Sequence, residues 1–168
     1  MTPLPAALGG VDLVGWRLDN AQHASAWDSG EGSYRAARRW NLKGVRAVYC
    51  SLDPSTAILE VAVHTGFEAL DIVPHVLTSF SVDDLAGVHV VDSASIPDQG
   101  WLRPGTATAD QQAFGTELLA RHKFVLIPSA VSSHSWNLIF ISGRAAAAYA
   151  LRSQEKFALD ARLHRSTN

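Results

Sequence analysis

A short strand that leads directly into a helix is the strongest fold signal in this sequence. Residues 46–51 (RAVYCS) are of β-type composition and are bounded by glycine and proline, which is typical of a short strand. Asp53 has a side chain suited to an N-cap, and Pro54 suits the first helical position because proline has no amide hydrogen to lose there. The sequence therefore predicts a helix over residues 54–65, ended by Gly66.

Strand and helix signals alternate along the rest of the chain without a strict order. Strands are predicted at 75–82, 87–91, 123–128 and 138–141, a helix from the Thr108/Gln111 capping box, a short helix at 145–151 and an edge strand at 156–163. Residues 92–110 are the most loop-like, and we expect part of them to form a lid or a surface excursion. Because strands outnumber helices and do not alternate with them, the predicted class is α+β with a mixed sheet.

Length and composition limit the classes of protein to consider. The 168 residues are 47% hydrophobic, so we interpret residues 1–168 as one domain able to bury a sizeable core. Fourteen Lys and Arg against sixteen Asp and Glu give a formal charge of −2, which argues against a protein that binds mainly by neutralising many phosphates.

Location and metal content are predicted from what the sequence lacks. Residues 1–10 contain no signal-peptide pattern and no apolar run approaches the roughly twenty residues of a membrane span, so we expect a cytoplasmic protein without membrane contact. The lone Cys50 is predicted to be a buried apolar residue. Glu60 and His64 share a helix face, but two ligands are too few for a structural metal site, and we expect no metal.

Glu60 is the first candidate for chemistry. It lies in an otherwise apolar run, residues 57–63 (AILEVAV), on the predicted helix. A single Glu on a helix is most often simply solvated. The run leaves little polar face for Glu60 to join, however, and a partly buried carboxylate needs a partner and suits acid–base or electrostatic catalysis.

Residues 34–46 (YRAARRWNLKGVR), called the basic segment below, combine five basic residues with two aromatic ones. This composition fits an ordinary basic surface loop, or an anion site with a stacking surface for a dinucleotide or single-stranded nucleic acid. Arg17, the one cation of an apolar stretch, is expected to be an ion-pair partner, with Glu60 as one possible mate. Tyr49 shares a strand face with Ala47 and is expected in the core, and Ser129 reads as a turn serine.

The order of these pieces carries a resemblance. They are Trp16-Arg17, Gly30-Glu31-Gly32, Arg39-Trp40-Asn41 with Gly44, Val48-Tyr49, Leu59-Glu60-Val61 with His64, Ile127-Pro128-Ser129-Ala130 and Asn137-Leu138. Over about residues 14–163 they resemble the RES-domain family, toxins of bacterial type II toxin–antitoxin pairs that are named for Arg, Glu and Ser. The chain departs from that pattern at Ala37-Arg38, where the family has Gly-Gly, and at residues 140–144 (FISGR).

The resemblance implies a fold like that of the ADP-ribosyltransferase toxins, a split mixed sheet with a cleft that holds NAD+. It implies three catalytic residues: Glu60 to stabilise positive charge on the ribose, Tyr49 to face the pyridinium ring, and Arg17 to hold the diphosphate or adenosine ribose. The NAD+-binding residues it implies are Arg39, Ser129, Trp40, Asn41 and Asn137, of which Ser129 contacts substrate or orients Glu60 while Trp40 and Asn41 shape the loop.

The activity implied is cleavage of the nicotinamide–ribose bond of NAD+ with transfer of ADP-ribose to a protein target. One alternative is transfer to water or phosphate, which depletes NAD+, and a further one is an RNA-binding or RNA-cleaving toxin that uses the basic segment. The partner implied is an antitoxin whose helix-turn-helix part binds DNA and which blocks the cleft, so that this chain itself contacts no nucleic acid.

Overall fold

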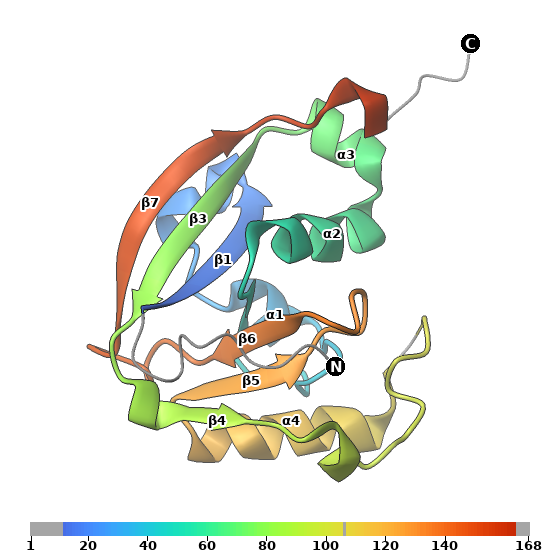
Figure 1. Ribbon diagram of the computed structural model, residues 1–168, viewed down its shortest axis with the longest axis vertical. Helices are drawn as coiled ribbons and strands as arrows, with labels where there is room; N and C mark the ends of the chain where they lie inside the picture. The colour runs from blue at the N-terminus through green and yellow to red at the C-terminus, as the bar shows by residue number, and fades with distance from the viewer. Residues whose placement is uncertain (1–11, 106, 164–168) are drawn as a thin grey trace.

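Seven strands form one mixed sheet in the computed structural model, which describes residues 12–105 and 107–163 (Figure 1). They are β1 (Leu13–Asn20), β2 (Val48–Ser51), β3 (His75–Val82), β4 (Val88–Val90), β5 (Phe124–Pro128), β6 (Trp136–Phe140) and β7 (Tyr149–Phe157). The spatial order is β4-β5-β6-β2-β1-β3-β7, with β4 and β5 parallel and every other pair antiparallel. The prediction about a signal peptide concerns residues 1–10, which lie outside the described residues.

The sheet is split between β1 and β2. These two strands share one register pair, Trp16 opposite Ser51, whereas β1 and β3 pair along eight residues. Figure 1 shows β1, β3 and β7 curving away as one half, with β4, β5 and β6 below them as the other. The predicted class, α+β with a split mixed sheet, is confirmed.

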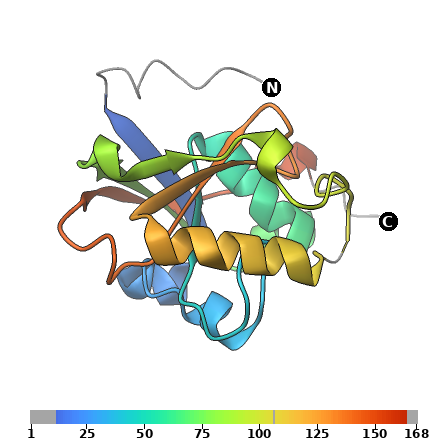
Figure 2. The same cartoon turned by 90° about the horizontal axis from the view of Figure 1, so that it is seen from below.

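Helices cover the two half-sheets from different sides. They are α1 (Glu31–Arg35), α2 (Pro54–Thr65), α3 (Phe67–Ile72) and α4 (Ala109–Arg121), with short 3₁₀ turns η2 (Ala21–Ala26), η3 (Leu85–Gly87), η4 (Ser93–Ser95) and η5 (Ala161–Leu163). Helix α4 crosses the lower half-sheet (Figure 2), and α2 lies against β1 and β2. No helix in the described part of the chain is long and apolar enough to cross a membrane.

Both predicted helix starts are confirmed by their caps. The Asp53 carboxylate accepts a 2.8 Å hydrogen bond from the Thr56 amide, which satisfies one of the free N–H groups at the start of α2. At the start of α4 the Thr108 hydroxyl accepts from the Gln111 amide at 3.2 Å, and the Gln111 side chain accepts from the Thr108 amide at 3.1 Å.

The central strands β5 and β6 are buried on both faces. Phe124, Leu126, Leu138 and Phe140 face a core that also holds Trp27 and Phe80. Val125, Ile127 and Ile139 face the second core, shared with α4 and with Trp40 and Trp101. This double burial explains why residues 124–128 read as a continuous apolar run rather than an alternating one.

Two predictions near the C-terminus are wrong. Residues 145–151 do not form a helix: Ala145 and Ala148 are buried in turns, and β7 begins at Tyr149. The edge strand exists, but it is β7 and ends at Phe157. Pairing along the whole of β3 supplies the backbone hydrogen bonds of this region, and this tertiary contact overrides the helical preference of a run of alanines. Neither β1 nor α3 was predicted.

Residues 92–105 are tied to the body of the protein at two points. Ile96 is 1% exposed and Trp101 is 4% exposed, and both belong to the second core, beside α4. The Trp101 and Trp40 rings lie 6.1 Å apart. Much of this loop is therefore a surface excursion held between buried anchors.

Candidate active site

Glu60 lies where α2 meets the ends of β5 and β6. Its Oε1 accepts two hydrogen bonds, from the Ser129 hydroxyl at 2.8 Å and from Asn137 Nδ2 at 2.6 Å. Ser129 is fully buried and Asn137 is 7% exposed, whereas Glu60 is half-buried. Glu60, Ser129 and Asn137, with the Ser51 that contacts Asn137, are called the Glu60 cluster below.

Ser129 is oriented by the turn that follows β5. Its oxygen accepts from the amides of Val131 at 3.2 Å and Ser132 at 3.0 Å, so its hydroxyl hydrogen is directed to Glu60. The expectation of a turn serine is confirmed, and the hydrogen bond to Glu60 is the contact that a serine orienting this carboxylate would make.

The negative charge of Glu60 is not neutralised by a neighbouring cation. Both of its hydrogen-bond donors are uncharged, and no salt bridge reaches it from residues 12–105 or 107–163. Both hydrogen bonds go to Oε1, so Oε2 is left to accept hydrogen bonds from a bound molecule. A half-buried, unneutralised carboxylate of this kind can stabilise positive charge that develops in front of it.

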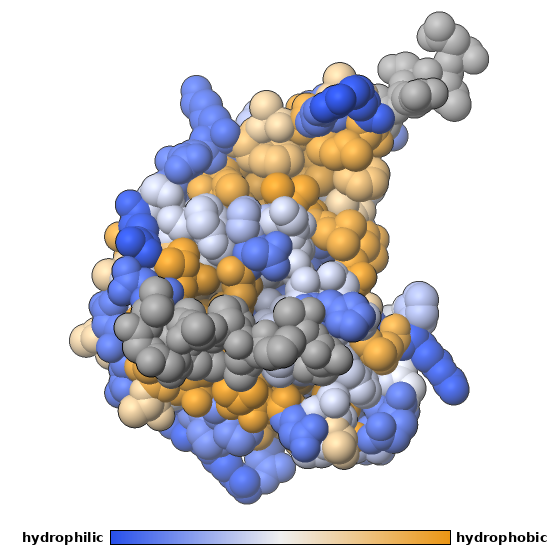
Figure 3. Space-filling view, viewed as in Figure 1, coloured by the Kyte–Doolittle hydropathy of each residue, from blue (hydrophilic) through white to orange (hydrophobic). Residues whose placement is uncertain are grey.

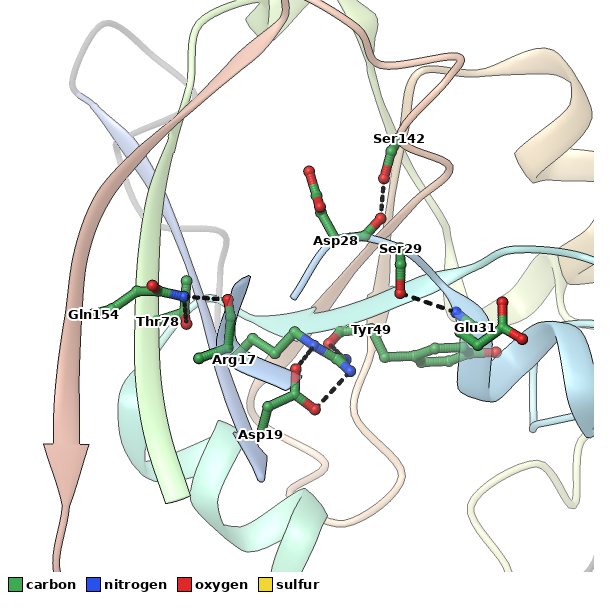
Figure 4. Close-up of polar contacts among 10 residues, drawn as sticks. Arg17, Asp19, Asp28, Ser29, Glu31, Tyr49, Thr78, Ser142 and Gln154 are labelled. Atoms are coloured by element: carbon green, nitrogen blue, oxygen red, sulfur yellow. Dashed lines mark hydrogen bonds and ion pairs between the residues drawn. The ribbon is translucent and has the colours of Figure 1, made fainter. Parts of the chain in front are cut away.

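Arg17 pairs with Asp19 and not with Glu60, which corrects the mate suggested from sequence. Its Nε and Nη2 donate to the Asp19 carboxylate at 2.5 and 2.9 Å, and Nη1 donates to the Tyr49 carbonyl at 2.8 Å (Figure 4). Asp19 lies two residues along β1, on the same side of the strand, so the fork-to-fork contact needs no long-range approach. Sequence reasoning missed Asp19, because β1 was not predicted as a strand and the two-residue spacing therefore carried no meaning.

Tyr49 is held by its hydroxyl. That group donates to Asn41 Oδ1 at 2.7 Å and accepts from the Trp40 amide at 3.1 Å. Burial raises the pKa of Tyr49, so the hydroxyl stays protonated and keeps these two bonds. Tyr49 and Ala47 belong to the same apolar cluster, which confirms that they share a strand face.

Trp40 and Asn41 shape the basic segment from inside. Trp40 is 2% exposed, and Asn41 Nδ2 donates to the carbonyls of Ser33 at 3.2 Å and Leu42 at 2.9 Å. Within the described chain these side chains contact their own loop, Tyr49 and the second core. The expectation that they form the loop is supported by these contacts.

Arg39 joins the basic segment to the loop 92–105. Its Nη1 donates to the Trp101 carbonyl at 2.7 Å and its Nη2 to the Arg103 carbonyl at 3.5 Å. Figure 3 shows the surface hollowed between this loop and the apolar surface over α2 and α3. The remaining N–H groups of Arg39 are available to an anion.

Two further cations of the basic segment, Arg35 and Arg46, are paired with Glu31, which lies just before the segment in sequence. Arg35 and Arg46 both form salt bridges with Glu31, and together they lower the pKa of that carboxyl. The Arg46 guanidinium also lies 4.3 Å from the centre of the Tyr34 ring. Glu31 is fixed further by a 3.3 Å contact from its amide to the Ser29 hydroxyl (Figure 4).

Sequence reasoning also missed Ser51, which donates to Asn137 Oδ1 at 2.8 Å. Period-two alternation from Tyr49 was the available signal, because it puts both side chains on one face of β2. Among the described residues, no three His, Cys, Asp or Glu side chains lie close enough together to hold a metal ion. A shallow hollow at the other end of β1, lined partly by Asp12, Asp83 and Arg152, touches none of these site residues.

Comparisons with known proteins place the chain in a family. Residues 14–163 match the family model described as the RES domain. The chain is 28% identical over 129 residues to a curated protein of Photorhabdus laumondii named Toxin Res, covering 76% of this chain and 80% of that protein. It superimposes with a TM-score of 0.69 and 21% identity on a chain of the M. tuberculosis MbcT–MbcA toxin–antitoxin complex, covering 88% of this chain and 85% of that one. The resemblance drawn from the sequence is therefore confirmed, and the protein belongs to the RES-domain family.

Proposed function

We propose that the protein is the toxin of a toxin–antitoxin pair and that it cleaves the nicotinamide–ribose bond of NAD+. The observation that carries the proposal is the Glu60 carboxylate, which uncharged donors hold on one oxygen while no cation of the described chain neutralises it. The similarity to Toxin Res and to a toxin–antitoxin complex supports the role of a toxin.

Cleavage of this bond passes through an oxocarbenium-like state, with positive charge on the ribose. Glu60 would stabilise that charge, and Oε2 would accept hydrogen bonds from the ribose hydroxyls. The two hydrogen bonds to Oε1 hold the carboxylate before substrate arrives, so little reorganisation is needed during the reaction. Glu60 is therefore the proposed catalytic residue.

Arg17 and Arg39 are the proposed contacts for the diphosphate or the adenosine ribose. A guanidinium has five N–H donors. Arg17 uses three of its five on Asp19 and Tyr49, and Arg39 uses two on the carbonyls of the loop 92–105. Each retains donors for an anion while its orientation is already set, which reduces the entropy lost on binding. The proposed role of Tyr49 is to present its ring to the pyridinium.

A protein side chain is the acceptor of ADP-ribose that we favour, which would make the protein a mono-ADP-ribosyltransferase. Residues 140–144 differ from the family pattern at one end of the site, and this difference favours an acceptor other than water or phosphate. Transfer to water or phosphate, with depletion of NAD+, is the alternative. The RNA-directed alternative has less support, because Arg35 and Arg46 are already paired with Glu31.

An antitoxin that covers the cleft is the proposed partner, with DNA contacts made by the antitoxin through a helix-turn-helix part. Leu59 and Val63 of α2 lie one residue before and three residues after Glu60 and are 37% and 59% exposed. Apolar side chains left exposed beside a polar site are typical of a surface that a protein partner covers. The place of action would be the bacterial cytoplasm.

The test is nicotinamide release from NAD+ by the purified protein, with Glu60→Gln and Glu31→Gln as a matched pair of variants. We expect Glu60→Gln to lower the rate by about 100-fold or more because the stabilising charge is lost. Glu31→Gln removes a surface carboxylate and is expected to stay within about 2-fold.

Added phosphate and added cell lysate then distinguish the acceptors. Stimulation by phosphate indicates depletion of NAD+, whereas label transferred from NAD+ to a lysate protein indicates protein modification. Absence of nicotinamide release by the wild type, with and without both additions, would overturn the proposal.

A further inference from the structure

Ser51 lies at the seam of the split sheet. It is the last residue of β2, it pairs with Trp16 of β1 on one side and with Asn137 of β6 on the other, and it is 2% exposed. The next residue, Leu52, donates its amide to the Trp136 carbonyl at 3.0 Å. The backbone of Ser51 is therefore held on both sides, immediately before the chain enters α2 and reaches Glu60.

The side chain of Ser51 begins a relay of two hydrogen bonds that ends on Glu60. The Ser51 hydroxyl donates to Asn137 Oδ1 at 2.8 Å, and Asn137 Nδ2 donates to Glu60 Oε1 at 2.6 Å. The direction follows from the chemistry of the groups. An ionised carboxylate only accepts, so the amide must present its NH2 to Glu60 and its oxygen to Ser51, which then donates.

The carboxylate sets which end of the Asn137 amide faces it, and the Ser51 hydroxyl holds the other end. An amide turned by 180° would direct its oxygen at Glu60, and two acceptors would repel each other. In the orientation that Glu60 requires, the Ser51 hydroxyl gives Oδ1 a donor on the side away from Glu60, so both ends of the amide are hydrogen-bonded and the amide is held in place. Without it, Glu60 Oε1 keeps Ser129 as its one firm donor, and the carboxylate loses part of its fixed orientation.

We propose that Ser51 is a positioning residue that acts through Asn137 to hold Glu60 in its catalytic orientation. The inference rests on the proposed cleavage of NAD+ for its kinetic consequence, but the positioning of the amide stands on these contacts alone. Ser51 is expected to affect kcat and not KM, because the proposed contacts to the rest of NAD+ come from Arg17 and Arg39.

The experiment compares Ser51→Ala, Ser51→Thr and the control Ser79→Ala in the full chain. Ser79 is also a buried strand serine, and its hydroxyl contacts Ser153 at 2.8 Å instead of the Glu60 cluster. We expect Ser51→Ala to lower kcat for nicotinamide release about 10-fold with KM within about 2-fold, the effect of one lost orienting hydrogen bond. Ser51→Thr keeps the hydroxyl and is expected to restore most of the rate. Ser79→Ala is expected to leave kcat unchanged.

A second measurement does not depend on activity. The side-chain NH2 signals of Asn137 in a ¹H–¹⁵N NMR spectrum are expected to shift or broaden in Ser51→Ala and to stay in place in Ser79→Ala. If Ser51→Ala does not fold, Ser51→Cys retains a weaker donor and is expected to show smaller changes in the same direction.

The outcomes separate the two proposals. If the wild type releases no nicotinamide, the proposed function fails, and the NMR signals alone decide whether Ser51 positions Asn137. If those signals are unchanged in Ser51→Ala, or if Ser51→Thr loses as much kcat as Ser51→Ala, the positioning role is overturned. A loss of kcat in Ser79→Ala as large as that in Ser51→Ala would reduce Ser51 to a merely structural residue.

Discussion

Glu31 and Glu60 are two carboxylates of one chain that the structure treats in opposite ways. Glu31 is paired with Arg35 and Arg46 at the surface, and these cations lower the pKa of its carboxyl. Glu60 is half-buried, and its partners Ser129 and Asn137 carry no charge. A carboxylate that is neutralised by cations stabilises the local surface structure. A carboxylate held by uncharged donors retains a negative charge that can interact with a ligand.

The same contrast applies to the cations. The basic segment is the densest run of positive charge in the sequence, yet Arg35 and Arg46 are committed to Glu31 and Arg39 is tied to the loop 92–105. Density of charge along the sequence therefore overestimates the charge that is free to bind an anion. Availability is decided by the partners that folding provides.

The largest expected effect comes from weakening the hold on Glu60 directly. Ser129→Ala removes a donor to Glu60 and should lower nicotinamide release by about 10- to 100-fold. It also leaves the part-buried amides of Val131 and Ser132 without their acceptor, which should reduce the free energy of unfolding by about 1–3 kcal/mol. Steady-state kinetics and denaturant unfolding measure the two effects. Ser132→Ala is the control, since that hydroxyl contacts Ser135 and not Glu60. A wild-type rate of nicotinamide release in Ser129→Ala would mean that the uncharged donors to Glu60 do not matter for activity, and the contrast drawn between Glu60 and Glu31 would fail.

The next effect tests how the basic segment is held. A Cβ on Gly115 of α4 would lie 2.2 Å from the Trp40 carbonyl oxygen, so Gly115→Ala should destabilise the protein by about 1–3 kcal/mol. In an exposed helix the same change stabilises by about 1 kcal/mol. The sign of the change in the free energy of unfolding therefore shows whether α4 packs closely on the basic segment. Urea unfolding measures it. An increase in stability would mean that α4 does not pack this closely on the segment.

A smaller effect is expected for Glu31, whose pH dependence distinguishes a role in stability from a role in catalysis. The pKa of Glu31 is lowered in the folded protein, so its stabilising contribution is present above the ordinary value of 4.5 and is lost as pH falls through the folded pKa. Glu31→Gln should therefore melt slightly below the wild type at pH 7, and the two melting curves should converge in acid. A difference that persists unchanged in acid, or a loss of nicotinamide release in this variant at neutral pH, would contradict the assignment.

The smallest effect is expected for the exposed cations of the basic segment. Arg38 and Lys43 have exposed side chains, and the double variant Arg38→Ala/Lys43→Ala should change nicotinamide release by no more than about 2-fold. The RNA-directed alternative would instead be favoured if the wild type bound RNA strongly, if that affinity fell steeply with added salt, and if the double variant no longer bound RNA.

The elements that were predicted well carry their signals locally. Asp53 and Pro54 define the start of α2, and the Thr108/Gln111 capping box defines that of α4, because a cap is formed by residues three positions apart. The predicted strand at 75–82 matches β3. The prediction of a helix at 145–151 was wrong for the opposite reason. Strand β7 forms because it pairs with β3, and no local sequence pattern indicates that pairing.

The site shows the same division. Glu60 and Ser129 stood out because a carboxylate in an apolar run and a serine after a buried strand fit the RES pattern. Arg17 was expected to pair with Glu60, but it forms its salt bridge with Asp19, which lies two residues away on the same side of β1. Alternation from Tyr49 indicates only the strand face on which Ser51 lies, and its role depends on Asn137, which lies 86 residues further along the chain.

Local patterns in the sequence are enough to predict the α+β class, the two capped helices, the central apolar strands and the candidate carboxylate. Only the folded chain brings Glu60 to Ser129 and Asn137, 69 and 77 residues away, and partly neutralises the densest cluster of cations. The physical reason is range. Caps, turns and strand patterns are short-range and are written in neighbouring residues, whereas the charge left on a side chain depends on every group that folding brings within hydrogen-bond distance of it.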